Sequence, residues 1–420
     1  MASVLVVGGG GREHAICLAL SKSKHVDKLY CLPGNAGISE IAECAPIAAT
    51  DLDGVLGFVK AHDDIVMTVV APDDPLAMGM VDMLESNGFR AFGPHKNAAI
   101  IEASKAFSKK LMKKYGIPTA DYREFDDYAA ACEYAEGAKY PLVVKADGLA
   151  LGKGVIICND KKEALEALEE MMVDKKFKAA GNVVVIEEFL TGKEVSVLAF
   201  TDGKTIVPMV SSQDHKRAHD NDEGANTGGM GTFSPSQAYT DDIAAETMAN
   251  IILPTMKAMN AEGRTFKGVL YFGLMLTADG VKVLEYNARF GDPETQVVLP
   301  RLKTDLYEIF DAIIDERLCE VEIEWDDMAA VCVILASGGY PGSYKKGVPI
   351  EIGDIDKDVT LYHAGTAFDK DGRLVTSGGR VIGVTARGKD IAAARAKAYA
   401  NVQKIKFDGA FWRTDIGIKK

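Results

Sequence analysis

One stretch decides the fold: Lys145-Ala146-Asp147-Gly148-Leu149-Ala150-Leu151-Gly152-Lys153-Gly154. It joins two apolar runs of strand length, Pro141–Lys145 and Gly154–Cys158. A P-loop would space its glycines one residue further apart, would carry Ser or Thr where Gly154 stands, and would lead from a strand into a helix. The stretch instead predicts a glycine-rich hairpin over a nucleotide, flanked by Lys145 and Lys153. A solvated hairpin that carries lysines is the alternative.

The residues around this hairpin predict a small α+β unit. A basic helix is expected over Lys105–Tyr115, because Gly116-Ile117-Pro118 then stops it. An amphipathic helix is expected at Lys161–Met172, and a buried strand at Asn182–Ile186. We therefore take residues 104–193 as a lid-like lobe, followed by a larger lobe at residues 194–324.

The first hundred residues alternate strands with helices. Strands are expected at Val4–Val7, Lys28–Cys31, Ile65–Val70 and Phe89–Phe92, and helices at Glu13–Ser21 and Pro75–Asn87. This order predicts a parallel sheet covered by helices, a Rossmann-like domain over residues 1–103. The last part of the chain carries expected strands at Ala330–Ala336 and Val381–Thr385 and a helix at Asp390–Lys404. These elements predict a small α+β domain over residues 325–420.

Four successive glycines, Gly8 to Gly11, stand where the first strand turns into the first helix, and Arg12 follows them. Backbone amides and the N-terminus of a helix in such a turn bind an anion. A dinucleotide fingerprint would need glycine at Glu13 and an acid at the end of the second strand, where Leu32-Pro33-Gly34-Asn35 stands instead. The turn therefore predicts a phosphate or phosphosugar site. A tight turn without a ligand is the alternative.

Two oxygen-bearing side chains end a predicted strand near residue 285. Alternation along the strand puts Val281, Val283, Glu285 and Asn287 on one face. Glu285 and Asn287 then emerge together, which suits Mg²⁺ shared with ATP phosphates. A polar cap at the end of a strand is the alternative.

A polar stretch from Ser211 to Ser234 interrupts the larger lobe and has almost no apolar periodicity. A stretch of this length inside a compact domain usually means function or disorder. Ser212–Arg217 and Asn226–Gly231 bracket it, and their mixture of charge and glycine suits a small zwitterion together with a phosphate. A plain surface loop is the alternative. Zinc binding by His215 and His219 is disfavoured, because the acids and the glycine around them argue against a regular helix.

Bulk properties exclude several classes of protein. The chain has 420 residues, enough for two to four domains, and its formal net charge of −13 opposes broad binding of nucleic acid. Its seven cysteines form no CxxC pair, so a reduced, cytoplasmic protein is expected. No apolar run approaches the roughly 20 residues of a membrane span, and the N-terminal residues do not resemble a secretory signal.

Together these motifs resemble the phosphoribosylamine–glycine ligase family (glycinamide ribonucleotide synthetase) of the ATP-grasp superfamily. The resemblance runs through essentially the whole chain. It rests on Gly10–Ala15, Pro33–Gly37, Lys145–Gly154, Ile186–Leu190, Ser212–Arg217, Asn226–Gly231, Arg289–Gln296, His363–Thr366, Ser377–Val381 and Arg413–Gly417. Each segment is modest alone, but their number and their order argue against a chance match.

The resemblance implies an α/β and α+β multidomain fold, with a Rossmann-like N-terminal domain, a two-part ATP-grasp core and a small C-terminal domain. It also implies that ATP, glycine and 5-phosphoribosylamine give glycinamide ribonucleotide, ADP and phosphate, an early step of purine biosynthesis. A carboxylate is a poor acyl donor until it is phosphorylated, so we expect glycyl phosphate as the intermediate. Such a transfer needs positioning and neutralised charge more than a nucleophilic side chain.

Individual residues take their expected roles from this mechanism. Glu285 and Asn287 are expected to hold Mg²⁺ or Mn²⁺. Expected at ATP are Lys105, Lys145, Gly152, Lys153, Gly154, Glu187, Phe189, Leu190 and Glu194; the resemblance implies adenine for Glu187 to Leu190 and ribose for Glu194. Expected at the phosphoribosylamine and glycine sites are Gly9, Gly10, Gly11, Arg12, Asn35, Asp73, Asp214, Lys216, Asn226, Thr227, Gly228 and Arg289. Catalytic roles are expected for Arg289, Lys145 and Asp214.

One residue departs from the family pattern, and three rival functions are open. The family usually has Gly-Pro-Glu where this chain has Ala71-Pro72-Asp73, so the sugar contact of the shorter acid is in doubt. A ligase or carboxylase for a later purine intermediate would use bicarbonate or formate and would not depend on glycine. A nucleotide sensor would lack the metal carboxylate or the loop lysines, yet Glu285, Lys145 and Lys153 are present. A dehydrogenase is disfavoured, because a dinucleotide-binding turn would need glycine where Glu13 stands. We expect a monomer, because no heptad or large apolar stripe stands out.

Overall fold

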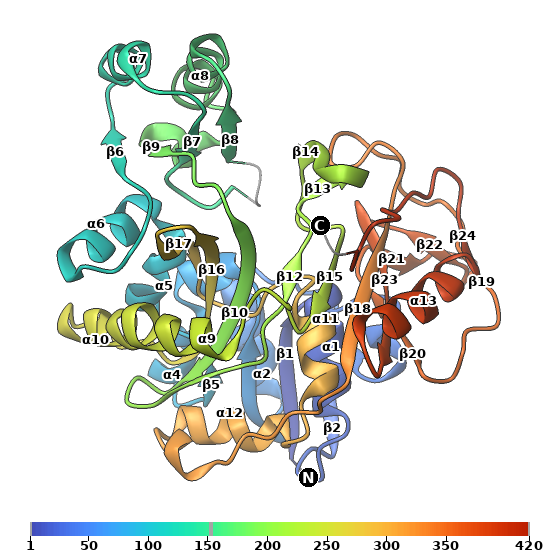
Figure 1. Cartoon of the computed structure of the whole chain (residues 1–420). Helices are drawn as coiled ribbons and strands as arrows, with labels where there is room; N and C mark the ends of the chain where they lie inside the picture. Colours follow the sequence, from blue (N-terminus) through green and yellow to red (C-terminus); the bar gives the residue numbers. More distant parts are fainter. Residues whose placement is uncertain (1, 151–153, 419–420) are drawn as a thin grey trace.

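The computed structural model of the chain describes residues 2–150 and 154–418. Its N-terminal part contains a parallel sheet in the order β3-β2-β1-β4-β5 (Figure 1). The strands are β1 (Ser3–Gly8), β2 (Lys28–Pro33), β3 (Glu43–Cys44), β4 (Ile65–Val70) and β5 (Ala91–Phe92). The predicted parallel sheet is confirmed. Its strand order reverses at β1, and sheets of this kind bind ligands beyond the carboxyl end of such a strand.

The first helix, α1 (Gly11–Leu20), begins two residues before the predicted Glu13. The cause is local: the carboxylate of Glu13 accepts the backbone N–H of Gly10 (2.6 Å), which satisfies a free donor of the first turn. The glycine turn therefore leads directly into the helix, as an anion site requires.

The single helix expected over Pro75–Asn87 is two helices, α3 (Asp73–Met78) and α4 (Met80–Ser86). Gly79 separates them with a φ of +95°, a left-handed conformation that ends a helix and that glycine adopts without strain. Because α3 begins at Asp73, this carboxylate stands at a helix N-terminus. The helix α2 (Leu52–Ala61) completes the helices between the strands of this sheet.

The residues around the glycine-rich hairpin form an antiparallel sheet of their own. Its strands, in spatial order, are β6 (Tyr122–Phe125), β9 (Val184–Glu188), β7 (Leu142–Ala146) and β8 (Val155–Cys158). The helices α7 (Tyr128–Gly137) and α8 (Lys161–Leu168) share its apolar core, and the unit stands at the upper left of Figure 1. The predicted pairing of β7 with β8 is confirmed. The helix expected to reach Met172 is α-helical only to Leu168 and continues as a π-helical turn.

A second antiparallel sheet lies below this unit, in the order β11-β10-β16-β17. Its strands are β10 (Lys193–Thr201), β11 (Ile206–Pro208), β16 (Gly268–Thr277) and β17 (Gly280–Asn287). The helices of this region are α5 (Lys96–Ala103), α6 (Lys105–Tyr115), α9 (Asp241–Thr247), α10 (Leu253–Ala261), α11 (Thr295–Val298) and α12 (Leu306–Ile314). The predicted helix Lys105–Tyr115 is confirmed at both ends.

A third large sheet joins distant parts of the chain, in the order β12-β15-β18-β23-β20. Its strands are β12 (Gln213–Asp214), β15 (Gly231–Ser234), β18 (Ala329–Ala336), β20 (Val359–His363) and β23 (Arg380–Gly388), and α13 (Ile391–Val402) packs on it. The polar stretch is therefore ordered. Its ends enter this sheet, and between them lies the hairpin of β13 (Arg217–His219) and β14 (Glu223–Asn226). This sheet crosses residue 324, and the division of the chain at residues 103, 193 and 324 stays a prediction.

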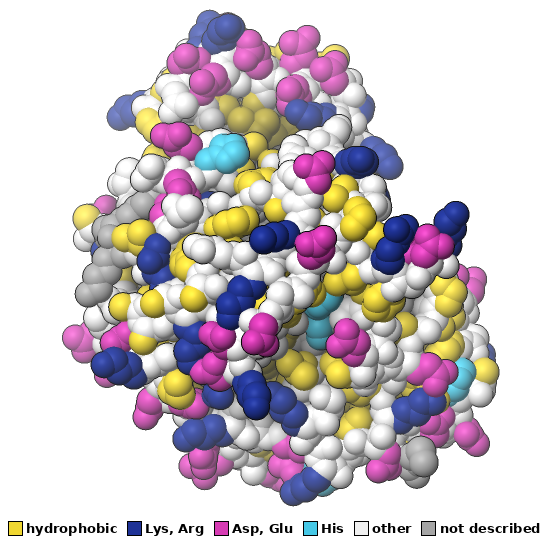
Figure 2. Space-filling view, turned by 90° about the vertical axis from the view of Figure 1, so that its right-hand side faces the viewer, with side chains coloured by type: hydrophobic (Ala, Val, Ile, Leu, Met, Phe, Trp, Pro, Cys, Tyr) yellow, Lys and Arg dark blue, Asp and Glu magenta, His cyan; other side chains and the backbone are white. Residues whose placement is uncertain are grey.

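Two small ladders complete the C-terminal part: β19 (Glu351–Ile352) with β24 (Ile405–Lys406), and β21 (Thr366–Phe368) with β22 (Leu374–Thr376). None of the described helices combines the length and the apolarity that a membrane span requires. Figure 2 shows basic and acidic side chains interspersed over one face of the molecule rather than gathered by sign. A polyanion would find no broad basic surface on that face.

His14 and His363 link α1 to the C-terminal sheet. Nδ1 of His14 accepts the backbone N–H of His363 (2.9 Å), and the imidazole of His363 contacts the hydroxyl of Thr366 (3.1 Å). Both imidazoles are buried. Burial disfavours the charged form, and it lowers the pKa of His14 to about 3 and that of His363 to about 4.

We predict that mild acid destabilises the fold through His14. The unfolded chain protonates this histidine below its ordinary pKa of 6.5, whereas the folded pKa is about 3. The unfolded state therefore binds more protons between these values, and the free energy of unfolding falls as the pH drops. In His14→Asn, an amide oxygen replaces Nδ1 as the acceptor but does not titrate. Urea unfolding should show that each pH unit below about 6 costs the wild type about 1.4 kcal/mol more than the variant. If the free energy of unfolding fell equally with pH in the wild type and in the variant, this role of His14 would be contradicted.

Candidate active site

A cleft of about 1750 Å³ is lined by residues from every predicted domain. Most of the predicted site residues line it: Arg12, Asp73, Lys145, Glu187, Phe189, Leu190, Glu194, Asp214, Lys216, Asn226, Thr227, Gly228, Glu285, Asn287 and Arg289. Among the described residues, those predicted for the site that do not line the cleft are Gly9, Gly10, Gly11, Asn35, Lys105 and Gly154. Gly152 and Lys153 lie outside the described residues.

Two lysines share one buried carboxylate at the upper side of the cleft. Oε2 of Glu187 lies 3.0 Å from Nζ of Lys109 and 2.9 Å from Nζ of Lys145. Lys145 also donates to the carbonyl of Leu284 (3.1 Å), so it joins β7 to β17. The other oxygen of Glu187, Oε1, is buried and has no hydrogen-bond partner among the described residues. This oxygen is available to a donor on a ligand.

A third lysine, Lys105, lies one helical turn before Lys109 on α6. Its ammonium donates to the carbonyl of Gly148 in the glycine-rich hairpin (3.2 Å). Burial lowers the pKa of Lys105, and it lowers the pKa of Lys109 to about 8 although the carboxylate of Glu187 opposes this. Three ammonium groups gather in this region, which suits the phosphates of a nucleotide.

Glu285 and Asn287 do line the cleft together, but the predicted strand geometry is wrong. The register of β17 against β16 shifts at Leu284, which is left as a β-bulge. The bulge reverses the alternation, so Val281 and Val283 are buried in the core while Glu285 and Asn287 face the cleft. The four side chains therefore do not share one face. Bulges of this kind re-aim side chains at functional sites.

Lys216 holds Glu285 in its ionised form. Nζ of Lys216 lies 3.1 Å from Oε1 of Glu285 and 3.5 Å from Oε2 of Glu194. The charge of Lys216, assisted by that of Lys145, lowers the pKa of Glu285 to about 2 against the effect of burial. Burial also opposes the charge of Lys216, but Glu285 and Glu194 outweigh it and raise the pKa of Lys216 well above its ordinary value. An ionised carboxylate beside an amide oxygen is a donor set that Mg²⁺ prefers, so Glu285 and Asn287 fit the predicted metal.

Two arginines meet on one backbone carbonyl. Arg12 and Arg289 both donate to the carbonyl of Phe290, at 3.1 and 3.3 Å. Glu102 holds Arg289 through an ion pair (2.7 Å), and burial raises the pKa of Glu102 to about 7. Burial opposes the ionisation of Asp73, but Arg289 and Arg12 outweigh it and lower its pKa. Arg12 is itself paired with Glu13 (2.6 Å). The two guanidinium groups and Asp73 suit a phosphorylated sugar, because guanidinium binds phosphate and a carboxylate accepts from hydroxyls.

Asp214 shares its surroundings with a second carboxylate, Glu294. Burial and the charge of Glu294 raise the pKa of Asp214 well above its ordinary value. Glu294 accepts from the hydroxyl of Ser196 (3.1 Å), which also lies 2.9 Å from the hydroxyl of Tyr271. Both effects favour the protonated form of Asp214, which suits a group that takes up a proton.

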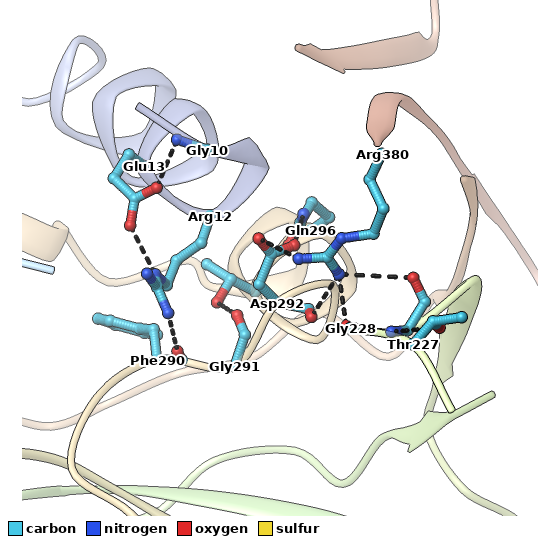
Figure 3. A network of polar contacts seen from close by, with 12 residues as sticks. Gly10, Arg12, Glu13, Thr227, Gly228, Phe290, Gly291, Asp292, Gln296 and Arg380 are labelled. Atoms are coloured by element: carbon cyan, nitrogen blue, oxygen red, sulfur yellow. Dashed lines mark hydrogen bonds and ion pairs between the residues drawn. The ribbon is translucent and has the colours of Figure 1, made fainter. Parts of the chain in front are cut away.

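A network around Arg380 joins two segments of the cleft (Figure 3). The guanidinium of Arg380 contacts the carboxylate of Asp292 (2.9 Å) and the carbonyl of Gly228. The side-chain amide of Gln296 donates to the same carboxylate (2.7 Å). Arg380 thus connects the loop that contains Gly228 to the turn that follows Arg289.

The glycine turn is held from inside the protein. The side-chain amide of Asn35 donates to the carbonyl of Gly9 (2.9 Å) and to that of His363 (2.8 Å). Asn35 therefore positions the turn, and a direct contact of this residue with a substrate stays a prediction. A Cβ on Gly11 would lie 2.6 Å from Nε2 of Gln296, so the turn closely approaches this side chain of α11.

Comparison with known proteins matches one family over nearly the whole chain. Models of phosphoribosylglycinamide synthetase match in succession: its N domain over residues 2–102, its ATP-grasp (A) domain over residues 103–295 and its C domain over residues 330–419. The chain belongs to the phosphoribosylglycinamide synthetase family. The resemblance and the multidomain ATP-grasp fold predicted from the sequence are confirmed, and so is an ATP-dependent carbon–nitrogen ligase of purine biosynthesis.

Relatives named phosphoribosylamine–glycine ligase cover the chain fully. That of Caldanaerobacter subterraneus is 49% identical, over 98% of this chain and 99% of that protein. The trifunctional purine biosynthetic protein adenosine-3 of Gallus gallus is 48% identical, over 99% of this chain and 42% of that protein. The crystal structure of phosphoribosylamine–glycine ligase from Thermotoga maritima has a TM-score of 0.84 at 34% identity, over 99% of this chain and all of that one.

A more distant solved structure shows the fold alone. The biotin carboxylase domain of 2-oxoglutarate carboxylase from Hydrogenobacter thermophilus, in complex with MgADP and bicarbonate, has a TM-score of 0.76 at 14% identity. It covers 98% of this chain, and this chain matches 91% of that one. The family models and the named relatives favour a ligase over the rival dehydrogenase and the rival sensor.

Several residues of the cleft or its support escaped the sequence analysis. They are Glu102, Lys109, Ser196, Tyr271, Asp292, Glu294, Tyr340 and Arg380. The sequence did contain a signal for Lys109: residues four apart on a helix share a face, and Lys105 was already assigned to ATP. Asp292, Glu294 and Arg380 stand inside segments that carry the family resemblance, but their chemistry depends on partners far away in the chain.

We predict that affinity for nucleotide falls as the pH rises through the pKa of Lys109. The ammonium, with a pKa of about 8, adds positive charge beside Glu187 and Lys145, and alkaline solution removes it. Lys109→Met should weaken binding of a non-hydrolysable ATP analogue about tenfold at neutral pH, the usual effect of losing a charged hydrogen bond. Above the pKa of Lys109, the wild type should lose more affinity than the variant in isothermal titration calorimetry.

The matched control is Lys110→Met, an exposed lysine on the same helix that pairs with Glu124. It should bind the analogue as the wild type does. An alkaline loss of affinity as large in Lys109→Met as in the wild type would contradict this role of Lys109.

Proposed function

We propose that this chain carries out the phosphoribosylamine–glycine ligase reaction in the cleft through glycyl phosphate. The γ-phosphoryl group of ATP passes to a carboxylate oxygen of glycine, and ADP is released. The amine of 5-phosphoribosylamine then attacks the carbonyl carbon; the C–N bond forms, the C–O bond to phosphate breaks, and a proton leaves the amine. The grouping in one cleft of a carboxylate fit for a cation, Lys145 for phosphate and a separate pair of arginines carries this proposal.

In this proposal ATP lies between two antiparallel sheets, that of β6, β9, β7 and β8 and that of β11, β10, β16 and β17. Lys105 and Lys145 neutralise its phosphates, and the hairpin that ends at Gly154 covers them. Leu190 is nearly buried and Phe189 is partly exposed beside it, so together they offer an apolar surface to adenine. The unpartnered Oε1 of Glu187 accepts from the amino group of the base. Glu194 accepts from the ribose hydroxyls.

Glu285 and Asn287 hold the divalent cation, for which we propose Mg²⁺, with Mn²⁺ as the alternative. The low pKa of Glu285 supports this role, because a metal ligand must be ionised at neutral pH. A cation held by these two residues would supply positive charge to the phosphates of ATP. Lys216 lies beside the same carboxylate and keeps it in place.

The two small substrates occupy the rest of the cleft. Arg12 and Arg289 bind the phosphate of 5-phosphoribosylamine, Arg289 also stabilises charge during phosphoryl transfer, and Asp73 accepts from the sugar. The substrate loop, which we define as Asn226, Thr227 and Gly228, holds glycine together with Lys216. Asp214 accepts the proton that the amine loses, and its raised pKa supports this role.

The glycine turn at Gly9, Gly10 and Gly11 keeps its proposed role near the phosphosugar. It acts through α1, whose first turn carries Arg12 into the cleft. We also propose, as the sequence predicts, that the enzyme works as a monomer in the cytoplasm.

Release of phosphate from ATP tests the reaction. With glycine and freshly prepared 5-phosphoribosylamine supplied together, the wild type should release phosphate, and omission of either should abolish the release. Glu285→Gln should slow it by about two orders of magnitude, because the cation loses its charged ligand. Glu320→Gln, at an exposed ion pair, is the control and should match the wild type. Release that does not depend on glycine would contradict the proposed substrate.

A further inference from the structure

Two segments of the family resemblance, His363–Thr366 and Ser377–Val381, take no part in the chemistry proposed above. Backbone hydrogen bonds join the two segments. The N–H of Gly365 donates to the carbonyl of Arg380 (2.9 Å), and the N–H of Ser377 donates to the carbonyl of Gly365 (2.8 Å). They therefore form one rigid frame at the start of β23, and this frame presents the side chain of Arg380 to the cleft.

A third segment is fixed to the same frame. Ser337 donates its N–H to the carbonyl of Gly379 (2.7 Å) and its hydroxyl to the carbonyl of Gly378 (2.8 Å). Gly379 lies so close to the ring of Tyr340 that any Cβ there would collide with the ring. These contacts fix Tyr340 and Arg380 relative to each other. Glycine at position 379 is thus explained by packing rather than by a turn.

Tyr340 and Arg380 together hold both backbone polar groups of Gly228 in the substrate loop. The N–H of Gly228 donates to the hydroxyl of Tyr340 (3.0 Å), and Nη1 of Arg380 donates to the carbonyl of Gly228. A Cβ on Gly228 would lie 3.0 Å from Cζ of Arg380, so the guanidinium also packs against the loop. The loop is in this way attached to the C-terminal frame rather than to its own neighbours alone.

Arg380 holds a second segment at the same time (Figure 3). Nη1 donates to the carbonyl of Asp292 (2.8 Å), and Nη2 pairs with its carboxylate (2.9 Å). Gln296 donates to the other oxygen of this carboxylate and packs against Gly11. One guanidinium therefore connects the substrate loop, the turn at Asp292 and, through Gln296, the glycine turn. The planar fork of arginine makes this possible, whereas the single ammonium of lysine cannot reach all these acceptors.

We propose that Tyr340 and Arg380 are positioning residues that set the geometry of the substrate loop, and that they govern the affinity for glycine and 5-phosphoribosylamine but not for ATP. This inference rests on the function proposed above. The physical reason is that the polar groups of both side chains bind the loop and Asp292. The residues assigned to ATP instead belong to α6, β7, β9, the segment that follows β9, and β10.

Steady-state kinetics of Tyr340→Phe and Arg380→Lys test this inference. Tyr340→Phe removes one acceptor and nothing else, and Arg380→Lys keeps the charge but loses the fork. In each variant the KM for glycine or for 5-phosphoribosylamine should rise about tenfold, as expected when a hydrogen bond in the site is lost. The KM for ATP should stay within about twofold, the range of a change that leaves the nucleotide contacts intact. The control is Arg387→Lys on the same strand, in an exposed ion pair with Asp326 (3.2 Å), and it should match the wild type.

Two results would overturn the inference: unchanged KM values for both small substrates, or a rise in the KM for ATP by the same factor, which marks a general loss of structure. Circular dichroism checks folding, and if Arg380→Lys does not fold, Tyr340→Phe carries the test because it only removes a hydroxyl. Phosphate release by the wild type that is independent of glycine would instead reject the proposed function itself. Glycine-dependent release with unaltered variants would reject the positioning role alone.

Discussion

Each of the main cationic side chains of the cleft forms an ion pair with a buried or half-buried carboxylate. The pairs are Lys145 with Glu187, Lys216 with Glu285, Arg289 with Glu102 and Arg380 with Asp292. An ammonium or guanidinium removed from water is costly without a partner, so each pair fixes its cation in one place before any ligand arrives. The partners come from different elements and therefore tie the sheets of the protein together at the cleft. A chain with a net charge of −13 binds anions through this local arrangement.

Local patterns in the sequence were sufficient for the parts of the fold that depend on neighbouring residues. The alternation of strands and helices gave the N-terminal parallel sheet, and the basic run ended by Gly116 gave α6 at its true bounds. The glycine-rich stretch between two apolar runs gave the pairing of β7 with β8. Most of the predicted site residues do line the cleft, because glycine turns and polar strand ends are local features and the family resemblance supplied others.

Features that depend on a distant partner could not be predicted in this way. The bulge at Leu284 exists only because β17 pairs with β16 in a shifted register, and no alternation within β17 reveals it. One end of the polar stretch, β15, pairs with β18, about a hundred residues later in the chain, and the other end, β12, pairs with β15. Glu102 lies far in sequence from Arg289, which it holds. The hydrogen bonds from the side-chain amide of Asn35 to the carbonyls of Gly9 and His363 also join residues far apart in the chain.

Oxygen-18 in the carboxylate of glycine tests most directly whether the γ-phosphoryl group of ATP passes through glycine. If glycyl phosphate forms, one labelled oxygen bridges carbon and phosphorus, and it leaves with the phosphate when the amine attacks the carbonyl carbon. Mass spectrometry of the phosphate released in a single turnover should therefore find one oxygen-18 atom in each phosphate, and the amide product should retain the other. Phosphate without label, alongside normal formation of product, would contradict transfer through glycyl phosphate and would require a different use of ATP in this cleft.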